Sequence, residues 1–191
     1  MNQTTLIVIA VVVIVAIVVI AGLIWSRRRR SAHLRDRFGP EYDHAIAYEG
    51  GRSKAEAELA KREKRVSKLD IRPLEPAARI KFIDRWKDVQ ARFVDDPARA
   101  VADADALLGE VMTARGYPVS DFEQRAGDIS VDHPEVVRNY RAGHDIALRH
   151  AQGNASTEDL RQAMIHYRSL FDELVNETEA PAAERQTESA H

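Results

Sequence analysis

Hydrophobic residues recur along most of this chain at spacings of three and four, which is the pattern of amphipathic α-helices. No alternating pattern of useful length predicts a β-strand, so the sequence predicts an all-α fold. Proline, glycine and capping residues mark where the helices begin and end. We expect helices at 41–48, 53–68, 76–93, 97–116, a short one that opens at Ser120, 134–153 and 156–174.

The four long helices between residues 76 and 174 each carry a wide apolar stripe, and short loops join them. Such helices bury their stripes by packing side by side, with sequence neighbours antiparallel. The sequence therefore predicts an antiparallel helical bundle of four main helices plus the short helix that opens at Ser120. Capping boxes are expected at Ser53 with Glu56 and at Ser120 with Glu123, and Ser156 with Asp159 is expected to begin the last helix.

The start of the chain departs from the amphipathic pattern. Leu6–Trp25 is an unbroken apolar run that would extend roughly 30 Å as a helix, the thickness of the hydrocarbon layer of a bilayer. It is too long for the apolar core of a secretory signal peptide, and no basic residue precedes it. The sequence therefore predicts an uncleaved signal-anchor, an N-terminal transmembrane helix of a single-pass protein.

The basic residues Arg27, Arg28, Arg29 and Arg30 directly follow this run. Cytoplasmic flanks of membrane spans carry an excess of Lys and Arg, so we expect the C-terminal domain to be cytoplasmic. An extracytoplasmic domain is the alternative. The predicted organisation is a leader at 1–5, the anchor at 6–25, a basic juxtamembrane helical segment at 26–72, the bundle at 73–176 and a disordered tail at 177–191.

Charge is unevenly distributed around a formal net charge of -2. Residues 27–72 hold 14 Lys and Arg against 8 Asp and Glu, whereas residues 73–191 hold 14 against 22. A basic segment beside a predicted anchor indicates the lipid bilayer and its anionic lipid headgroups as partners. Nucleic acid is not an expected partner, because aromatic residues are sparse among these charges. It remains the alternative function for 27–72.

The apolar positions of residues 53–69 follow a coiled-coil spacing for about two heptads, fewer than a coiled coil requires. A weak homo-oligomer through 53–69 and a helix that packs against the rest of the chain are both compatible with this pattern.

Motifs for a cofactor, a metal or a catalytic centre are missing from the sequence. It contains no Gly-rich phosphate loop, no HExxH and no Gly-x-Ser-x-Gly, and its lack of cysteine excludes disulfides and thiolate metal sites. We therefore expect no cofactor, no metal and no catalytic residue. His144 falls in an apolar stripe and is interpreted as a core histidine, with a proton-sensitive packing switch as the alternative.

The densest polar group in the chain lies between residues 115 and 135. Helix capping and turns account for much of it, but loops on rigid scaffolds often carry binding residues. We therefore interpret this region as a candidate partner surface, formed by Tyr117, Asp121, Phe122, Arg125, Asp128 and His133. An enzymatic site in 115–135 is the alternative.

Several long and short segments together carry a resemblance to a known family, among them "FVDDPARAVADAD", "RGYPV", "SVDHP" and "STEDLRQAMIHYRSLFDELV". Over roughly residues 34–175 the chain resembles a family of uncharacterised bacterial proteins with a single N-terminal membrane span. The resemblance implies a bacterial plasma (inner) membrane setting and transfers no functional residue. Together these observations predict a membrane-tethered helical interaction module without catalytic activity, which docks an unknown protein partner.

Overall fold

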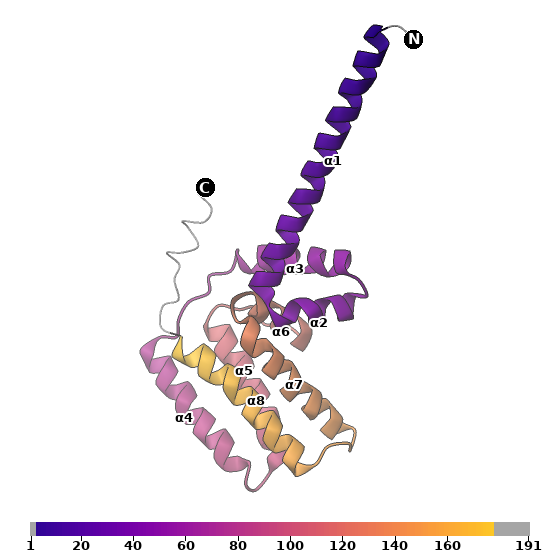
Figure 1. Ribbon diagram of the computed structural model, residues 1–191. Helices are drawn as coiled ribbons and strands as arrows, with labels where there is room; N and C mark the ends of the chain where they lie inside the picture. The colour runs from indigo at the N-terminus through magenta and orange to yellow at the C-terminus, as the bar shows by residue number, and fades with distance from the viewer. Residues whose placement is uncertain (1–2, 178–191) are drawn as a thin grey trace. The chain divides into compact units, whose positions relative to one another are not determined.

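The computed structural model describes the backbone of residues 3–177 and the side chains of residues 12–177. Every regular element in this part of the chain is an α-helix (Figure 1), which agrees with the predicted all-α class. The helices are α1 (Gln3–Phe38), α2 (Pro40–Glu49), α3 (Arg52–Val66), α4 (Pro76–Arg92), α5 (Pro97–Ala114), α6 (Phe122–Asp132), α7 (Pro134–Ala151) and α8 (Thr157–Asn176).

The predicted transmembrane helix is corrected by the structure. Within the described residues, no helix is both long enough and apolar enough to cross a membrane. The side chains of residues 6–11 lie outside the described residues.

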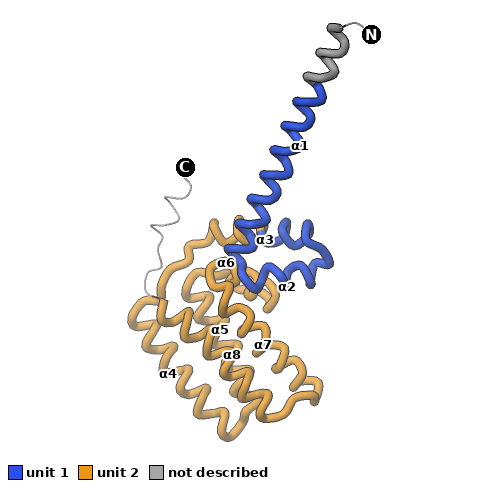
Figure 2. Tube along the Cα trace, in the orientation of Figure 1, with its two compact units in different colours: residues 1–59 blue, residues 60–191 orange. Residues whose placement is uncertain are grey.

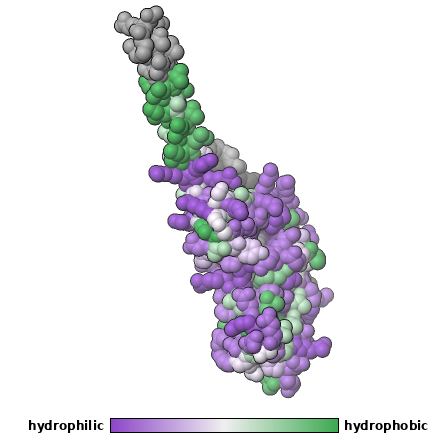
Figure 3. Space-filling view, turned by 90° about the vertical axis from the view of Figure 1, so that its right-hand side faces the viewer, coloured by the Kyte–Doolittle hydropathy of each residue, from purple (hydrophilic) through white to green (hydrophobic). Residues whose placement is uncertain are grey.

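This finding also overturns the predictions that depended on the span. They are the signal-anchor, the single-pass topology, the localisation to a bacterial inner membrane and the cytoplasmic or extracytoplasmic side of the C-terminal domain. The apolar side chains of α1 from Val12 to Trp25 are exposed in the chain itself, as the green surface in Figure 3 shows.

The chain divides into two compact units, residues 1–59 and residues 60–191 (Figure 2). We refer to them as unit 1 and unit 2. The first holds α1, α2 and the first half of α3, and the second holds the remaining helices. The predicted tail overlaps the described residues only at Glu177, and residues 178–191 lie outside them.

Unit 1 is organised around the turn between α1 and α2. The first helix ends at Phe38 because Gly39 adopts a positive φ of 45° and Pro40 cannot continue a helix from its interior. The turn allows α2 to bury its apolar side against the end of α1 and the start of α3. The core consists of Leu34, Phe38, Tyr42, Ala45, Ala55 and Leu59.

Unit 2 contains the predicted bundle of α4, α5, α7 and α8. The eighth helix packs against both α7 and α5, and α4 packs on the outer side of α5. Tyr140, Tyr167 and Leu108 are fully buried between these helices, and the ring of Trp86 stacks on Phe171 at 4.6 Å between centroids. The short helix α6 covers one part of α7.

Both predicted capping boxes are wrong. The third helix begins at Arg52, so Ser53 already lies inside it and cannot be its N-cap. The N-cap of α6 is Asp121, whose carboxylate accepts a hydrogen bond from the backbone N–H of Gln124 at 2.9 Å. The residue at which the chain turns into the helix becomes the N-cap, and aspartate is as effective an N-cap as serine. The predicted start of the last helix at Ser156 is confirmed: Ser156 is the N-cap of α8 and forms a capping box with Asp159.

The apolar positions predicted for a dimer seam are occupied within the single chain. Ala55, Leu59 and Val66 are all buried there. This burial supports the other interpretation of residues 53–69, that of a helix packed against its own chain.

Candidate functional site

An apolar groove in unit 2 lies where α4, α5 and the loop before α6 meet. Its volume is about 560 Å³, within the range of small-ligand and peptide pockets. We call it the docking groove. It is lined by Phe82, Ala106, Gly109, Glu110, Thr113, Ala114, Pro118, Val119, Ser120 and Arg125.

The loop that forms one wall is fixed by the end of α5. Gly116 takes a φ of 104°, and a β-carbon there would lie 2.2 Å from the carbonyl oxygen of Asp70. No other residue type fits this combination of backbone conformation and close approach. The backbone N–H of Tyr117 then bonds to the carbonyl of Met112, and the buried Tyr117 ring anchors the turn. Val119, which follows, projects outward and is 85% exposed.

Arg125 forms the polar edge of the groove. Its Nη2 donates a hydrogen bond to Oδ2 of Asp105 at 3.2 Å, and this carboxylate also accepts a bond from the hydroxyl of Tyr140 at 3.2 Å. The guanidinium lies over Gly109, where a β-carbon would meet Nη1 at 3.0 Å. The arginine is thus held in position from two sides, and among the described residues Asp105 is its only ion-pair partner.

An aromatic cluster lies behind Arg125. The ring of Phe122 stacks on His144 at 3.5 Å between centroids and packs on Tyr140 at 4.8 Å. Burial lowers the pKa of His144, although Asp105 and Asp145 oppose this shift, so the ring is favoured in its neutral form. Burial also raises the pKa of Tyr140. These groups form a rigid support for the groove.

Three of the six residues predicted for a partner surface lie in the interior. Tyr117, Asp128 and His133 are 2%, 1% and 5% exposed. The tyrosine hydroxyl donates to Asp132 at 3.2 Å, and Arg65 donates to Asp128 at 2.7 Å. Buried polar groups that are hydrogen-bonded inside the fold stabilise it, and they are not available to bind another protein.

His133 belongs to a cluster that ends α8. Its ring nitrogens lie 3.3 Å from Glu173 and 3.2 Å from Glu177. Arg115, itself buried, donates to the carbonyl of Leu174 at 3.2 Å and pairs with Glu177. Partial burial raises the pKa of Glu177, but His133 and Arg115 outweigh it and lower that pKa to about 2. This cluster fastens the end of the chain that the structure describes.

The other predicted site residues have different environments. Asp121 is the exposed N-cap of α6, and Phe122 is half-buried in the aromatic cluster. Only Arg125 lines the docking groove. The four predicted basic residues, Arg27, Arg28, Arg29 and Arg30, are exposed on α1.

Sequence reasoning missed most of the groove. The hydrophobic pattern of the sequence places Phe82 in the core and gives Val119 no role. A valine between Pro118 and Ser120, in a predicted turn, could have indicated an exposed apolar side chain. Gly109 and Asp105 of α5 come close to Arg125 of α6 only in the folded chain, which no local pattern reports. Within the described residues, no group of three or more His, Asp or Glu side chains is placed to hold a metal ion.

In comparisons with known proteins, no family model, no curated protein and no solved structure matches this chain. The resemblance to uncharacterised bacterial proteins therefore stays a prediction.

Proposed function

We propose that this protein is a non-catalytic helical interaction module that binds a segment of another protein in the docking groove. The observation that carries the proposal is that one groove is lined by both an exposed apolar side chain, Val119, and a cation that Asp105 holds in place, Arg125. Apolar anchors beside arginine are the residue types that dominate protein interfaces.

The chemistry of the groove defines the segment that it fits. Phe82, Val119 and the small residues of α5 offer an apolar floor for one apolar side chain. Arg125 donates from Nη2 to Asp105, and its Nε is buried without a hydrogen-bond partner among the described residues. A carboxylate of the partner, next to the apolar residue, would accept from the other N–H donors on Nη1 and Nη2.

The polar groups around α6 support a binding role over a catalytic one. Asp128 pairs with Arg65, His133 with two glutamates, and Tyr117 with Asp132. Each of these groups holds one segment of unit 2 onto another. A catalytic centre needs a base and a nucleophile that face a common space, whereas the docking groove offers neither a histidine nor a pair of carboxylates among its lining residues.

The experiment uses two exposed valines as a matched pair. A photo-crosslinking residue is placed at Thr113, which lines the groove and is exposed, and the full-length protein is irradiated in its native cells. We expect one discrete adduct. Val119→Asp should abolish the adduct, whereas Val94→Asp should leave it unchanged, since Val94 is equally exposed at 83% but lies in the turn before α5.

Circular dichroism of both variants checks that folding is intact. An adduct that survives Val119→Asp, or one that Val94→Asp removes equally, would show that the groove is not the docking surface. The partner segment found in the adduct is then synthesised, and Arg125→Gln should weaken its binding roughly tenfold, the usual effect of one lost charge-assisted hydrogen bond.

A further inference from the structure

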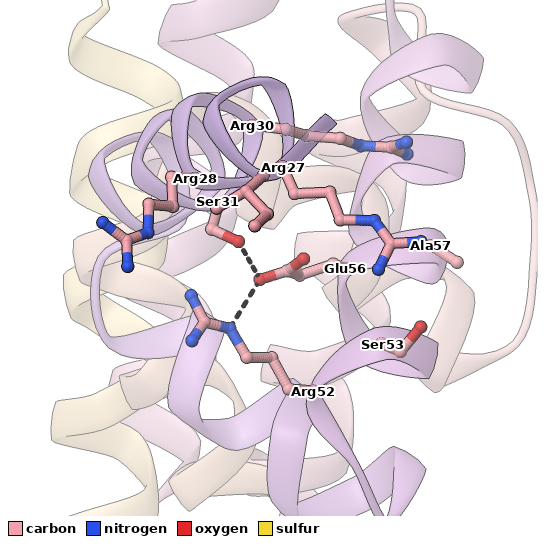
Figure 4. A pocket seen from close by; sticks show the side chains of 9 residues that line it. Arg27, Arg28, Arg30, Ser31, Arg52, Ser53, Glu56 and Ala57 are labelled. Carbon is pink, nitrogen blue, oxygen red and sulfur yellow. Dashed lines mark hydrogen bonds and ion pairs between the residues drawn. The ribbon is translucent and has the colours of Figure 1, made fainter. Parts of the chain in front are cut away.

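A second hollow lies in unit 1, between the last turns of α1 before residue 32 and the first turns of α3. Its volume is about 590 Å³. Its charged lining consists of four guanidinium groups and one carboxylate, a formal charge of +3 from these side chains. Arg27, Arg28 and Arg30 come from α1, and Arg52 and Glu56 come from α3 (Figure 4). We call it the arginine pocket.

The single carboxylate is already occupied by bonds inside the fold. Oε1 of Glu56 accepts hydrogen bonds from the hydroxyl of Ser31 at 2.6 Å, from the hydroxyl of Tyr42 at 2.7 Å and from Nε of Arg52 at 2.8 Å. Partial burial raises the pKa of Glu56, but the bonds from Ser31, Arg52 and Tyr42 outweigh burial and lower it to about 2. This carboxylate therefore stays ionised and holds α1, α2 and α3 together.

The remaining cations have no such partner. Arg27, Arg28 and Arg30 form no ion pair or hydrogen bond with the described residues. Arginines at these spacings on one helix repel one another. Their exposure lowers the cost through solvent screening, but their guanidinium groups keep their donors free for an external anion.

The four arginine side chains of the arginine pocket lie in two pairs, one on each side of the Ser31–Glu56 hydrogen bond. In Figure 4, Arg28 and Arg52 extend to one side of this bond, and Arg27 and Arg30 extend to the other. Each guanidinium matches two oxygens of a phosphate in a bidentate fashion. Two pairs of such groups match an anion that carries two phosphate groups better than a single phosphate.

The start of α3 adds to the positive electrostatic potential of the arginine pocket. Arg52 and Ser53 are the first residues of a 15-residue helix, and the unsatisfied N–H groups of a helix start favour anions. Glu56 also restrains Arg52 before any ligand arrives, so less conformational entropy is lost on binding.

We propose that the arginine pocket binds a compound or headgroup that carries two phosphate groups. The site is separate from the docking groove and does not depend on it. The pocket needs two linked phosphates because its cations form two pairs, and its volume of about 590 Å³ leaves room for the group that links them.

The test is isothermal titration calorimetry of the full-length protein with pyrophosphate and orthophosphate at equal, near-physiological ionic strength. We expect pyrophosphate to bind and orthophosphate to bind at least tenfold more weakly. Arg28→Gln with Arg30→Gln removes one arginine from each pair and should weaken pyrophosphate binding by roughly a hundredfold, a tenfold loss for each arginine.

The matched control is Lys54→Gln with Lys68→Gln, which removes the same charge from exposed positions that do not line the pocket. A diffuse electrostatic attraction would be weakened equally by both double variants, and that result would overturn the proposal. So would equal affinity for the two anions, or binding of neither pyrophosphate nor the vesicles described next.

A vesicle arm distinguishes the source of the phosphates. Flotation compares phosphatidylcholine vesicles that contain cardiolipin, whose headgroup holds two phosphates, with vesicles of the same charge that contain phosphatidylglycerol. A preference for cardiolipin that the arginine variant removes and the lysine variant keeps supports the site with a lipid headgroup as ligand. If pyrophosphate binds but cardiolipin vesicles are not preferred, the site is supported and its ligand is a small compound with two phosphate groups.

Discussion

Gly143 of α7 lies against the ring of Tyr167 of α8, so closely that a β-carbon at position 143 would stand 2.7 Å from Cε1 of the ring. The tyrosine is fully buried, and the carbonyl oxygen of Ala163 would lie 3.3 Å from the same carbon. The absence of a side chain at this position therefore allows α7 and α8 to pack closely.

We expect Gly143→Ala to destabilise unit 2 by about 1–3 kcal/mol. Alanine favours a helix over glycine by about 1 kcal/mol, but overpacking against a buried ring that cannot move outweighs this gain. Urea denaturation measures the free energy of unfolding. Gly22→Ala is the control, since Gly22 is also helical and a β-carbon there would have no atom within 4 Å. The prediction fails if Gly143→Ala is as well tolerated as Gly22→Ala.

Arg65→Ala should cost about 3–5 kcal/mol at neutral pH, because it leaves the carboxylate of Asp128 buried without its main cation. Thermal and chemical unfolding measure the loss. Arg161→Ala, which removes the exposed partner of Glu158, should have no measurable effect. Equal effects of the two substitutions would show that the buried pair adds no more than a surface pair does.

The same variant should recover stability in acid. Burial raises the pKa of Asp128, and Arg65 opposes that shift, so the pKa rises further when Arg65 is lost. A carboxyl group with a raised folded-state pKa favours the fold below its unfolded value and loses this contribution as the pH rises through the folded value. The difference in Tm between wild type and Arg65→Ala should therefore be smaller near pH 4 than near pH 8. A difference in Tm that is constant with pH would contradict the conclusion that ionised Asp128 causes the loss of stability.

Glu177→Gln should destabilise unit 2 by about 1–3 kcal/mol at pH 7, because Arg115 and His133 both lose the carboxylate that they share. The neighbouring change Glu173→Gln should have little effect, since that side chain is half exposed and contacts His133 alone in this cluster. Comparison of the two melting temperatures tests the prediction, and a larger effect at 173 than at 177 would reverse the roles assigned to these glutamates.

Glu56→Gln should destabilise unit 1 by about 1–3 kcal/mol, because three hydrogen bonds lose their charged acceptor. The folded-state pKa of about 2 lies below the unfolded value of 4.5. The contribution of Glu56 is therefore present above pH 4.5 and lost as the pH falls toward 2. The stability difference from wild type, followed by circular dichroism, should be constant from about pH 8 to pH 5 and shrink below it. Tyr42→Phe, which removes one of the three bonds and keeps the charge, should show a smaller loss that shrinks over the same range, because the Tyr42 bond also helps to lower the pKa of Glu56.

Local signals located most of the helices. Gly39-Pro40 separates α1 from α2, Asp96 with Pro97 opens α5, and Ser156 with Asp159 forms the capping box of α8. These signals act within one helical turn, so they can be recognised without the fold. The two wrong caps, at Ser53 and Ser120, have the same local pattern and differ only in where the chain turns.

The sequence by itself determined the all-α class, the order of the helices and the apolar stripes of the bundle, because helix periodicity and capping depend on residues that are close in the chain. It did not determine which polar residues are interior: Tyr117, Asp128 and His133 have the pattern of surface residues, but partners distant in the sequence bury them. It also left the Arg125–Gly109 contact and the Glu56 cluster unseen. Those arise only when helices pack, because packing brings together side chains that no spacing along the chain relates.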